Sequence, residues 1–395
     1  ELIAEMQPQP LRFTESPNAW SKSITTADGV DTHGVLNCHS SQNNAYSVGV
    51  TEDKGTRRYM EDAHSFVVDY AGVRGQGFFA IFDGHAGKHA AEWCGGHFHE
   101  FLLDALRAAP ERSIPDTLNE AFHNVDLRLS KMSEESEGKI HSGCTAVTAF
   151  LRIEDADGKQ SFLPAIPDLD AIDSPEEDPE SANNSSTKKS NNGGSKIKRA
   201  LKSLSGSGLL TPRSMSPTGG DSGTQYANGV KVILPPAGSR RVLYSANAGD
   251  ARGVLCRGGK AVRLTYDHKG TDKQEAKRIT DAGGFVMGGR VNGVLAVTRS
   301  LGDSSMKEFV VGSPYTTETE LCEDDELLIL ACDGLWDVAG DQQAVDLVRD
   351  IPDAQEASEK LLTYALNKST TDNVTVLVVR FKKAAERSAV TSPIA

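Results

Sequence analysis

The chain has 395 residues, of which 38% are hydrophobic and 25% charged, and its formal net charge at pH 7 is −13. This composition is typical of a globular protein with a full hydrophobic core. The acidic balance argues against nucleic acid or an anionic membrane as the main partner. No apolar stretch has membrane-spanning length, and no signal peptide is evident. The six cysteines form no CxxC pair, which favours reduced thiols in a cytoplasmic or nuclear protein.

The N-terminal part is polar and contains three prolines, so we expect residues 1–44 to form an irregular arm. Regular structure is expected from Ala45 onward, where two predicted strands flank a charged segment. That segment contains Arg57, Glu61 and Asp62. A surface ion-pair cluster would explain it, and so would an arginine that binds phosphate in front of two carboxylates. The segment alone leaves both interpretations open.

The stretch 77–87 is the most informative one in the chain. Its apolar, aromatic first half predicts a buried strand, which ends in Asp83, Gly84 and His85 before a helical pattern begins. A carboxylate and a glycine carbonyl can both approach a hard cation, and an imidazole titrates near neutral pH. Because Asp-Gly is also a common turn pair, a simple strand-to-helix turn explains the stretch equally well.

Hydrophobic periodicity predicts five helices further along the chain, over 88–106, 115–133, 272–282, 341–350 and 354–366. The predicted strands 142–151 and 241–246 are expected to pair as hairpin neighbours, with 254–257 as a further hairpin partner. Residues 155–238 are poor in apolar residues and rich in turn formers, which predicts a disordered insertion within a loop.

The insertion contains a basic stretch with spaced leucines at 196–204, followed by Thr211-Pro212 and Ser216-Pro217. This combination is similar to a docking segment for a proline-directed kinase. A solvated loop with chance motifs is the simpler interpretation and the one we favour.

Several aspartates lie where predicted core strands begin or end: Asp83, Asp250, Asp333, Asp337 and Asp372. Each one alone would be explained as a cap or a turn residue. If they converge, their carboxylates repel one another unless a cation lies between them. Oxygen ligands without thiolates favour Mg²⁺ or Mn²⁺ over structural zinc. A pair of such ions could clamp a phosphoryl oxygen and activate a water molecule.

The motifs of this chain closely resemble those of the metal-dependent serine/threonine protein phosphatases of type 2C, and they occur in the same order as in that family. The resemblance spans roughly residues 45–382 without the insertion. Within the family, the most similar proteins are the small fungal members, which turn off stress-activated kinase cascades. The matching segments are Arg57 with 60–62, 82–87, 142–146, 247–252, 267–269, 299–303, 333–337 and 372–373. One departure is Gly270, which stands where the family usually has proline.

The resemblance implies an α+β fold in which two antiparallel sheets form a β-sandwich flanked by helices, with a binuclear metal centre at one edge. It implies a phosphatase domain over 45–382 and a C-terminal tail over 383–395. Asp83 would bridge two Mg²⁺ or Mn²⁺ ions, and the Gly84 carbonyl would bind the first ion. Asp333 and Asp372 would bind the second.

The resemblance also implies roles around these two ions. Glu61 and Asp62 would hold metal-bound waters. Asp250 and Asp337, together with Asp333, would form a weaker third metal site.

Catalysis is expected from groups that face the phosphate. Arg57 would bind the phosphate, and His85 would protonate the leaving Ser or Thr oxygen. A metal-bridging hydroxide would attack phosphorus directly, without a phosphoenzyme. Asp303 would lie behind the residues that bind the ions and would not bind an ion itself.

The expected substrates are phosphorylated proteins, among them kinases of a stress or MAP kinase pathway, and we expect a monomer. A catalytically inactive binding module of the same fold is the alternative, although such relatives usually lose a ligand and every expected position is filled here. A generic acidic cation-binding protein is a third hypothesis, and Arg57 and His85 beside the carboxylates argue against it.

Overall fold

The structure is a computed structural model that describes residues 45–137, 139, 141–163, 224–227 and 230–383. The predictions for residues 1–44, for the stretch 196–204 and for Thr211 and Ser216 lie outside these residues. Among the described residues, no helix is long and apolar enough to cross a membrane.

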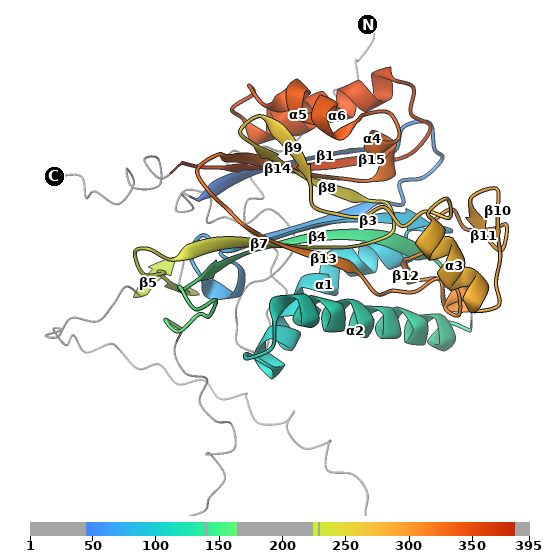
Figure 1. Ribbon diagram of the computed structural model, residues 1–395, viewed down its shortest axis with the longest axis horizontal. Helices are drawn as coiled ribbons and strands as arrows, with labels where there is room; N and C mark the ends of the chain where they lie inside the picture. The colour runs from blue at the N-terminus through green and yellow to red at the C-terminus, as the bar shows by residue number, and fades with distance from the viewer. Residues whose placement is uncertain (1–44, 138, 140, 164–223, 228–229, 384–395) are drawn as a thin grey trace, which may run out of the picture. The chain divides into compact units, whose positions relative to one another are not determined.

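Two antiparallel sheets pack face to face (Figure 1). The first sheet has the order β13 (Tyr315–Glu320), β7 (Arg240–Ala248), β4 (Gly143–Glu154), β3 (Gly77–His85) and β2 (Ala63–Val68), and the short β12 (Leu301–Gly302) pairs with β4. The second sheet has the order β1 (Tyr46–Asp53), β15 (Val374–Phe381), β14 (Asp325–Ala331), β8 (Arg252–Arg257) and β9 (Lys260–Arg263). Two separate hairpins join β5 (Thr224–Ala227) to β6 (Val230–Ile233) and β10 (Val286–Met287) to β11 (Arg290–Val291).

Helices cover the outer face of each sheet (Figure 1). The first sheet is covered by α1 (His89–Ala108) and α2 (Ile114–Glu135), and the second by α4 (Asp333–Trp336), α5 (Asp341–Val348) and α6 (Ala354–Asn367). The helix α3 (Lys273–Asp281) packs near β10 and β11. The predicted α+β sandwich of two antiparallel sheets flanked by helices is therefore confirmed.

The strand β3 shows why the central strands are apolar on both faces. Phe78, Ala80 and Phe82 pack against α1 and α2, whereas Phe79 and Ile81 face the second sheet. Alternate side chains of a strand point to opposite faces, so a strand between a helical layer and a sheet must be apolar throughout. Because the apolar run ends at Asp83, this carboxylate marks the end of the buried part of the strand.

One predicted pairing was wrong. The hairpin of β4 with β7 is present, but β8 does not pair with β7. It pairs instead with β14 and β9, in the second sheet. The chain changes sheets at Gly249, whose φ of +107° is in the region that favours glycine. Since β8 is buried on both faces, its sequence fits either sheet, and the local pattern could not choose between them.

Part of the predicted insertion has regular structure. A turn over 155–160 and the β5–β6 hairpin both lie inside the range 155–238 that was expected to lack regular structure. The prediction of disorder was therefore wrong for these residues.

Candidate metal centre

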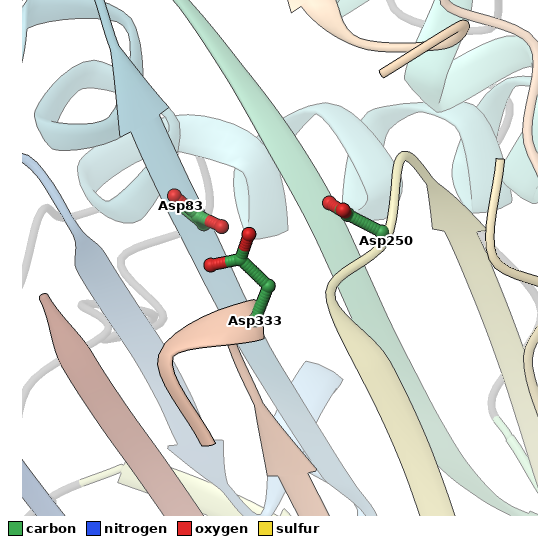
Figure 2. Close-up of side chains that lie close together, drawn as sticks. All are labelled: Asp83, Asp250 and Asp333. Atoms are coloured by element: carbon green, nitrogen blue, oxygen red, sulfur yellow. The ribbon is translucent and has the colours of Figure 1, made fainter. Parts of the chain in front are cut away.

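Three aspartates that are far apart in the sequence meet at one place. Asp83 is near the end of β3, Asp250 follows β7, and Asp333 is the first residue of α4, which Cys332 separates from β14. One carboxylate oxygen from each lies within 4.8 Å of the others, and Figure 2 shows Asp83 and Asp333 pointing toward each other while Asp250 approaches from the neighbouring loop. Both sheets therefore contribute acidic side chains to one cluster.

The carboxylates raise one another's pKa values. Burial, followed by the charges of Asp333, Asp62 and Asp250, raises the pKa of Asp83 well above its usual value. Burial and the charges of Asp250 and Asp372 raise the pKa of Asp333 to about 8. Such a cluster is unfavourable without a cation between its members. A donor set made only of oxygens fits a hard divalent ion such as Mg²⁺ or Mn²⁺.

Gly84 allows the segment that carries Glu61 and Asp62 to lie directly against β3. A Cβ at position 84 would lie 2.1 Å from the carbonyl oxygen of Glu61, a distance that no side chain rotation could relieve. Gly334 has the same role next to Asp333, where a Cβ would lie 1.9 Å from the carbonyl oxygen of Asn373. Both Asp-Gly pairs therefore serve close backbone packing around the cluster.

Asp62 is buried and its charge acts on Asp83, whereas Glu61 is held through its backbone. The Thr375 hydroxyl donates a hydrogen bond of 2.7 Å to Asp62 Oδ2, and burial raises the pKa of Asp62 to about 6. The Glu61 amide donates to Asn373 Oδ1 at 2.8 Å. Both residues are therefore positioned by the start of β15.

Asp372 joins the cluster electrostatically and is also paired with Arg57. Its charge contributes to the raised pKa values of Asp83 and Asp333. Arg57 Nη2 lies 2.6 Å from Asp372 Oδ2, and Arg57 Nε donates to the carbonyl oxygen of Thr371 at 3.1 Å. The predicted phosphate-binding residue thus contacts a predicted metal ligand.

Asp337 is linked to the cluster by Lys269, a residue to which the sequence analysis gave no role. Lys269 Nζ lies 3.2 Å from Asp250 Oδ2 and 3.2 Å from Asp337 Oδ1. Although burial opposes its charge, these two carboxylates raise the pKa of Lys269 further above its usual value. The matching segment 267–269 includes this lysine, but its acidic partners belong to other segments of the chain, so the segment alone does not show the pairing.

His85 lies two residues after Asp83 on β3, so the two side chains are on the same face of the strand. Its Nε2 is 2.7 Å from Asp303 Oδ2, and the Ser300 hydroxyl donates to the same oxygen. A Cβ at Gly143 would lie 2.1 Å from Asp303 Oδ2 and 2.5 Å from His85 Nε2. This glycine therefore makes room for the histidine–aspartate pair.

The structure thus brings most of the predicted residues to one end of the sandwich. The fold is an α+β sandwich of two antiparallel sheets, and its cluster of three carboxylates, of which Asp250 is buried, could hold a divalent cation. Known proteins make the class more specific. The family profile of protein phosphatase 2C matches residues 46–156 and 174–374.

Two curated relatives have similar sequences over most of their length. Protein phosphatase 2C homolog 1 of Saccharomyces cerevisiae is 39% identical over 338 residues, which cover 85% of this chain and 93% of the yeast protein. Its namesake in Schizosaccharomyces pombe is 36% identical over 352 residues, covering 88% and 77%. A serine-threonine phosphatase 2C structure from Toxoplasma gondii has the same fold, with a TM-score of 0.58, 18% identity and coverage of 86% of this chain and 95% of that one.

This chain therefore belongs to the protein phosphatase 2C family and is a metal-dependent protein serine/threonine phosphatase. The acidic cluster of Asp83, Asp250 and Asp333 is the part of the described structure that fits the metal.

Proposed function

We propose that this phosphatase hydrolyses phosphoserine and phosphothreonine with two Mg²⁺ or Mn²⁺ ions held at the acidic cluster, and that its substrates include kinases of a stress or MAP kinase pathway. The convergence of Asp83, Asp250 and Asp333 within 4.8 Å is the observation that carries the chemistry. The kinase substrates rest on the sequence resemblance to small fungal members of the family.

The proposed ligands divide between two main ions and a weaker third one. Asp83 and the Gly84 carbonyl hold the first ion, and Asp83, Asp333 and Asp372 hold the second. Glu61 and Asp62 orient water toward the ions, and Asp250, Asp337 and Asp333 form the third site. When bound, the ions supply positive charge for the phosphoryl oxygens and lower the pKa of a water molecule.

Arg57 is proposed to bind the phosphate while it remains anchored. A guanidinium carries five N–H donors. Among the described contacts, Nε is bonded to Thr371 and Nη2 to Asp372, whereas no hydrogen bond uses Nη1. Arg57 is about half exposed, with 53% of its side chain accessible. The free donors can therefore contact phosphate oxygens without loss of the anchoring bonds.

His85 is proposed to transfer a proton to the leaving oxygen. Nε2 lies 2.7 Å from Asp303 Oδ2 and faces that carboxylate. Nδ1 makes no hydrogen bond among the described contacts, so it is the atom that would donate the proton. Asp303 orients the ring.

The function is tested with a phosphothreonine peptide assayed side by side in Mg²⁺, in Mn²⁺ and with a chelator. We expect phosphate release with either ion and none with the chelator. A protein that binds the peptide but releases no phosphate under any of these conditions would be the inactive binding module instead.

Replacement of His85 by Gln is expected to slow hydrolysis of a phosphopeptide by about 100-fold or more and hydrolysis of an aryl phosphate much less. Aryl oxides are good leaving groups and do not need an acid. The measurement is kcat for both substrates, with His123→Gln, an exposed histidine on α2, as the control. Equal slowing of both substrates would argue against His85 as the acid.

The proposal includes a monomer in the cytoplasm or nucleus. In support, the cysteines among the described residues form no disulfide: Cys94, Cys144, Cys256, Cys322 and Cys332. This agrees with a reducing compartment.

A further inference from the structure

The side chain of Lys269 occupies the space between two of the proposed ligands of the third ion. Its Nζ is 3.2 Å from Asp250 Oδ2 and 3.2 Å from Asp337 Oδ1. Asp250 is buried, whereas the Asp337 side chain is 59% exposed. A single positive charge thus bridges a buried and an exposed carboxylate, at a place where a divalent ion would bind the same two oxygens.

Backbone contacts hold the main chain of Lys269 in place, whereas its side chain lies beside a cavity that it could enter. Its amide donates to the carbonyl oxygen of Asp267 at 3.1 Å, and the residue forms a β-bridge with Val297. The side chain lines a cavity of about 400 Å³, which Tyr266, Asp267 and Asp272 also line. A lysine ammonium sits on a flexible four-carbon stem. It can therefore leave Asp250 and remain near the carboxylates of this cavity.

We propose that Lys269 is a tethered cation that competes with the third divalent ion for Asp250 and Asp337. The inference rests on the third site of the proposed function. With Lys269 in place, its single positive charge offsets part of the negative charge of the two carboxylates without metal. A third ion must displace the ammonium, so its affinity is lower than that of the two other ions. Lys269 is thus a positioning residue that sets the occupancy of one metal site.

The competing explanation is a structural ion pair that only fastens the segment around Lys269 to the end of α4. The two explanations differ in what happens when the charge is removed. Competition predicts that the third ion binds more tightly once the ammonium is gone. A structural pair predicts lower stability and no gain in metal affinity.

The experiment titrates the full chain with Mn²⁺ alone, by calorimetry and by the electron paramagnetic resonance signal of free Mn²⁺. The variants are Lys269→Met, which removes the charge at similar length, and Lys269→Arg, which keeps it. Lys277→Met is the matched control, because Lys277 pairs with Asp281 on the exposed side of α3. Lys269→Gln serves as a second neutral variant if Lys269→Met does not fold.

We expect the weakest Mn²⁺ site to bind at least about tenfold more tightly in Lys269→Met, because two unit charges at this separation interact by more than that factor near a protein surface. In Lys269→Met, the two tighter sites should keep their wild-type Mn²⁺ affinities. In Lys269→Arg and Lys277→Met, all the Mn²⁺ affinities should be close to those of the wild type. Unchanged or weaker third-site affinity in both neutral variants would overturn the proposal. If the wild type and every variant bind no Mn²⁺ at all, the proposed metal sites fail as well, and this outcome separates the two claims.

Discussion

The variant Asp83→Asn is expected to lose at least about 100-fold in phosphatase activity and, in the absence of metal, to be more stable than the wild type. The activity falls because Asp83 is proposed to contact both ions. The stability rises because the substitution removes a carboxylate whose ionised form is disfavoured by burial and by the neighbouring charges of Asp333 and Asp62.

The pH dependence of this difference follows from the pKa shifts. The pKa of Asp83 is raised above its usual value of 3.8, and that of Asp333 is raised to about 8. The folded protein then binds these protons more tightly than the unfolded chain, so its metal-free stability falls as the pH rises from about 4 toward 8. Asparagine at position 83 does not ionise, so the stability gain of the variant should increase between pH 5 and pH 8.

The measurements are kcat at saturating Mn²⁺ and the melting temperature of the metal-free protein at pH 5 and at pH 8. The control is Asp104→Asn, an exposed aspartate on α1, which should match the wild type in both. Near-normal turnover at saturating Mn²⁺ would refute the bridging role of Asp83. A metal-free melting temperature that does not rise at pH 8 would refute the electrostatic account of the cluster.

The variant Gly84→Ala is expected to have the second largest effect. The added Cβ would lie 2.1 Å from the Glu61 carbonyl oxygen and 3.2 Å from the Ala91 Cβ. Because the first contact is with backbone, the segment of Glu61 and Asp62 must move away from β3. We expect a destabilisation of about 1–3 kcal/mol and a loss of activity of about 100-fold, since a shift of about 1 Å in a catalytic group can cost that much.

Gly96→Ala provides the matched control for this substitution. Gly96 lies within α1, and a Cβ there would have no heavy atom within 4 Å. Alanine is a better helix former than glycine by up to about 1 kcal/mol, so this variant should be slightly more stable than the wild type and fully active. Wild-type melting temperature and kcat in Gly84→Ala would show that the close contact with Glu61 is not needed.

The resemblance of the sequence motifs to the type 2C family implied the sandwich, and the positions of the aspartates at strand ends predicted an acidic cluster. The apolar run from Gly77 to Phe82 predicted a buried strand, and a strand that is apolar on both faces packs against a layer on either side. Aspartates at the ends of such strands, Asp83 and Asp333 among them, were expected to converge. Their positions follow from local patterns, because a carboxylate is excluded from a buried strand and is tolerated only where the strand ends.

The tertiary structure alone decided which groups accompany the acidic cluster. Arg57 and Asp372 are 315 residues apart, and His85 and Asp303 are 218 residues apart. Lys269 approaches Asp250 and Asp337 from a third segment. No short-range pattern encodes such pairs, because they depend on how strands from distant parts of the chain are ordered in the two sheets.

The sheet to which β8 belongs illustrates the same limit. The pattern of hydrophobic residues determined by itself that 254–257 is a buried strand and that the acidic residues lie at strand ends. An apolar segment that is buried on both faces, however, fits any central position in a sheet. The pattern did not determine the neighbours of that strand. Only the packing of the two sheets placed β8 beside β14, and with it set Asp250 against Asp333 in one cluster.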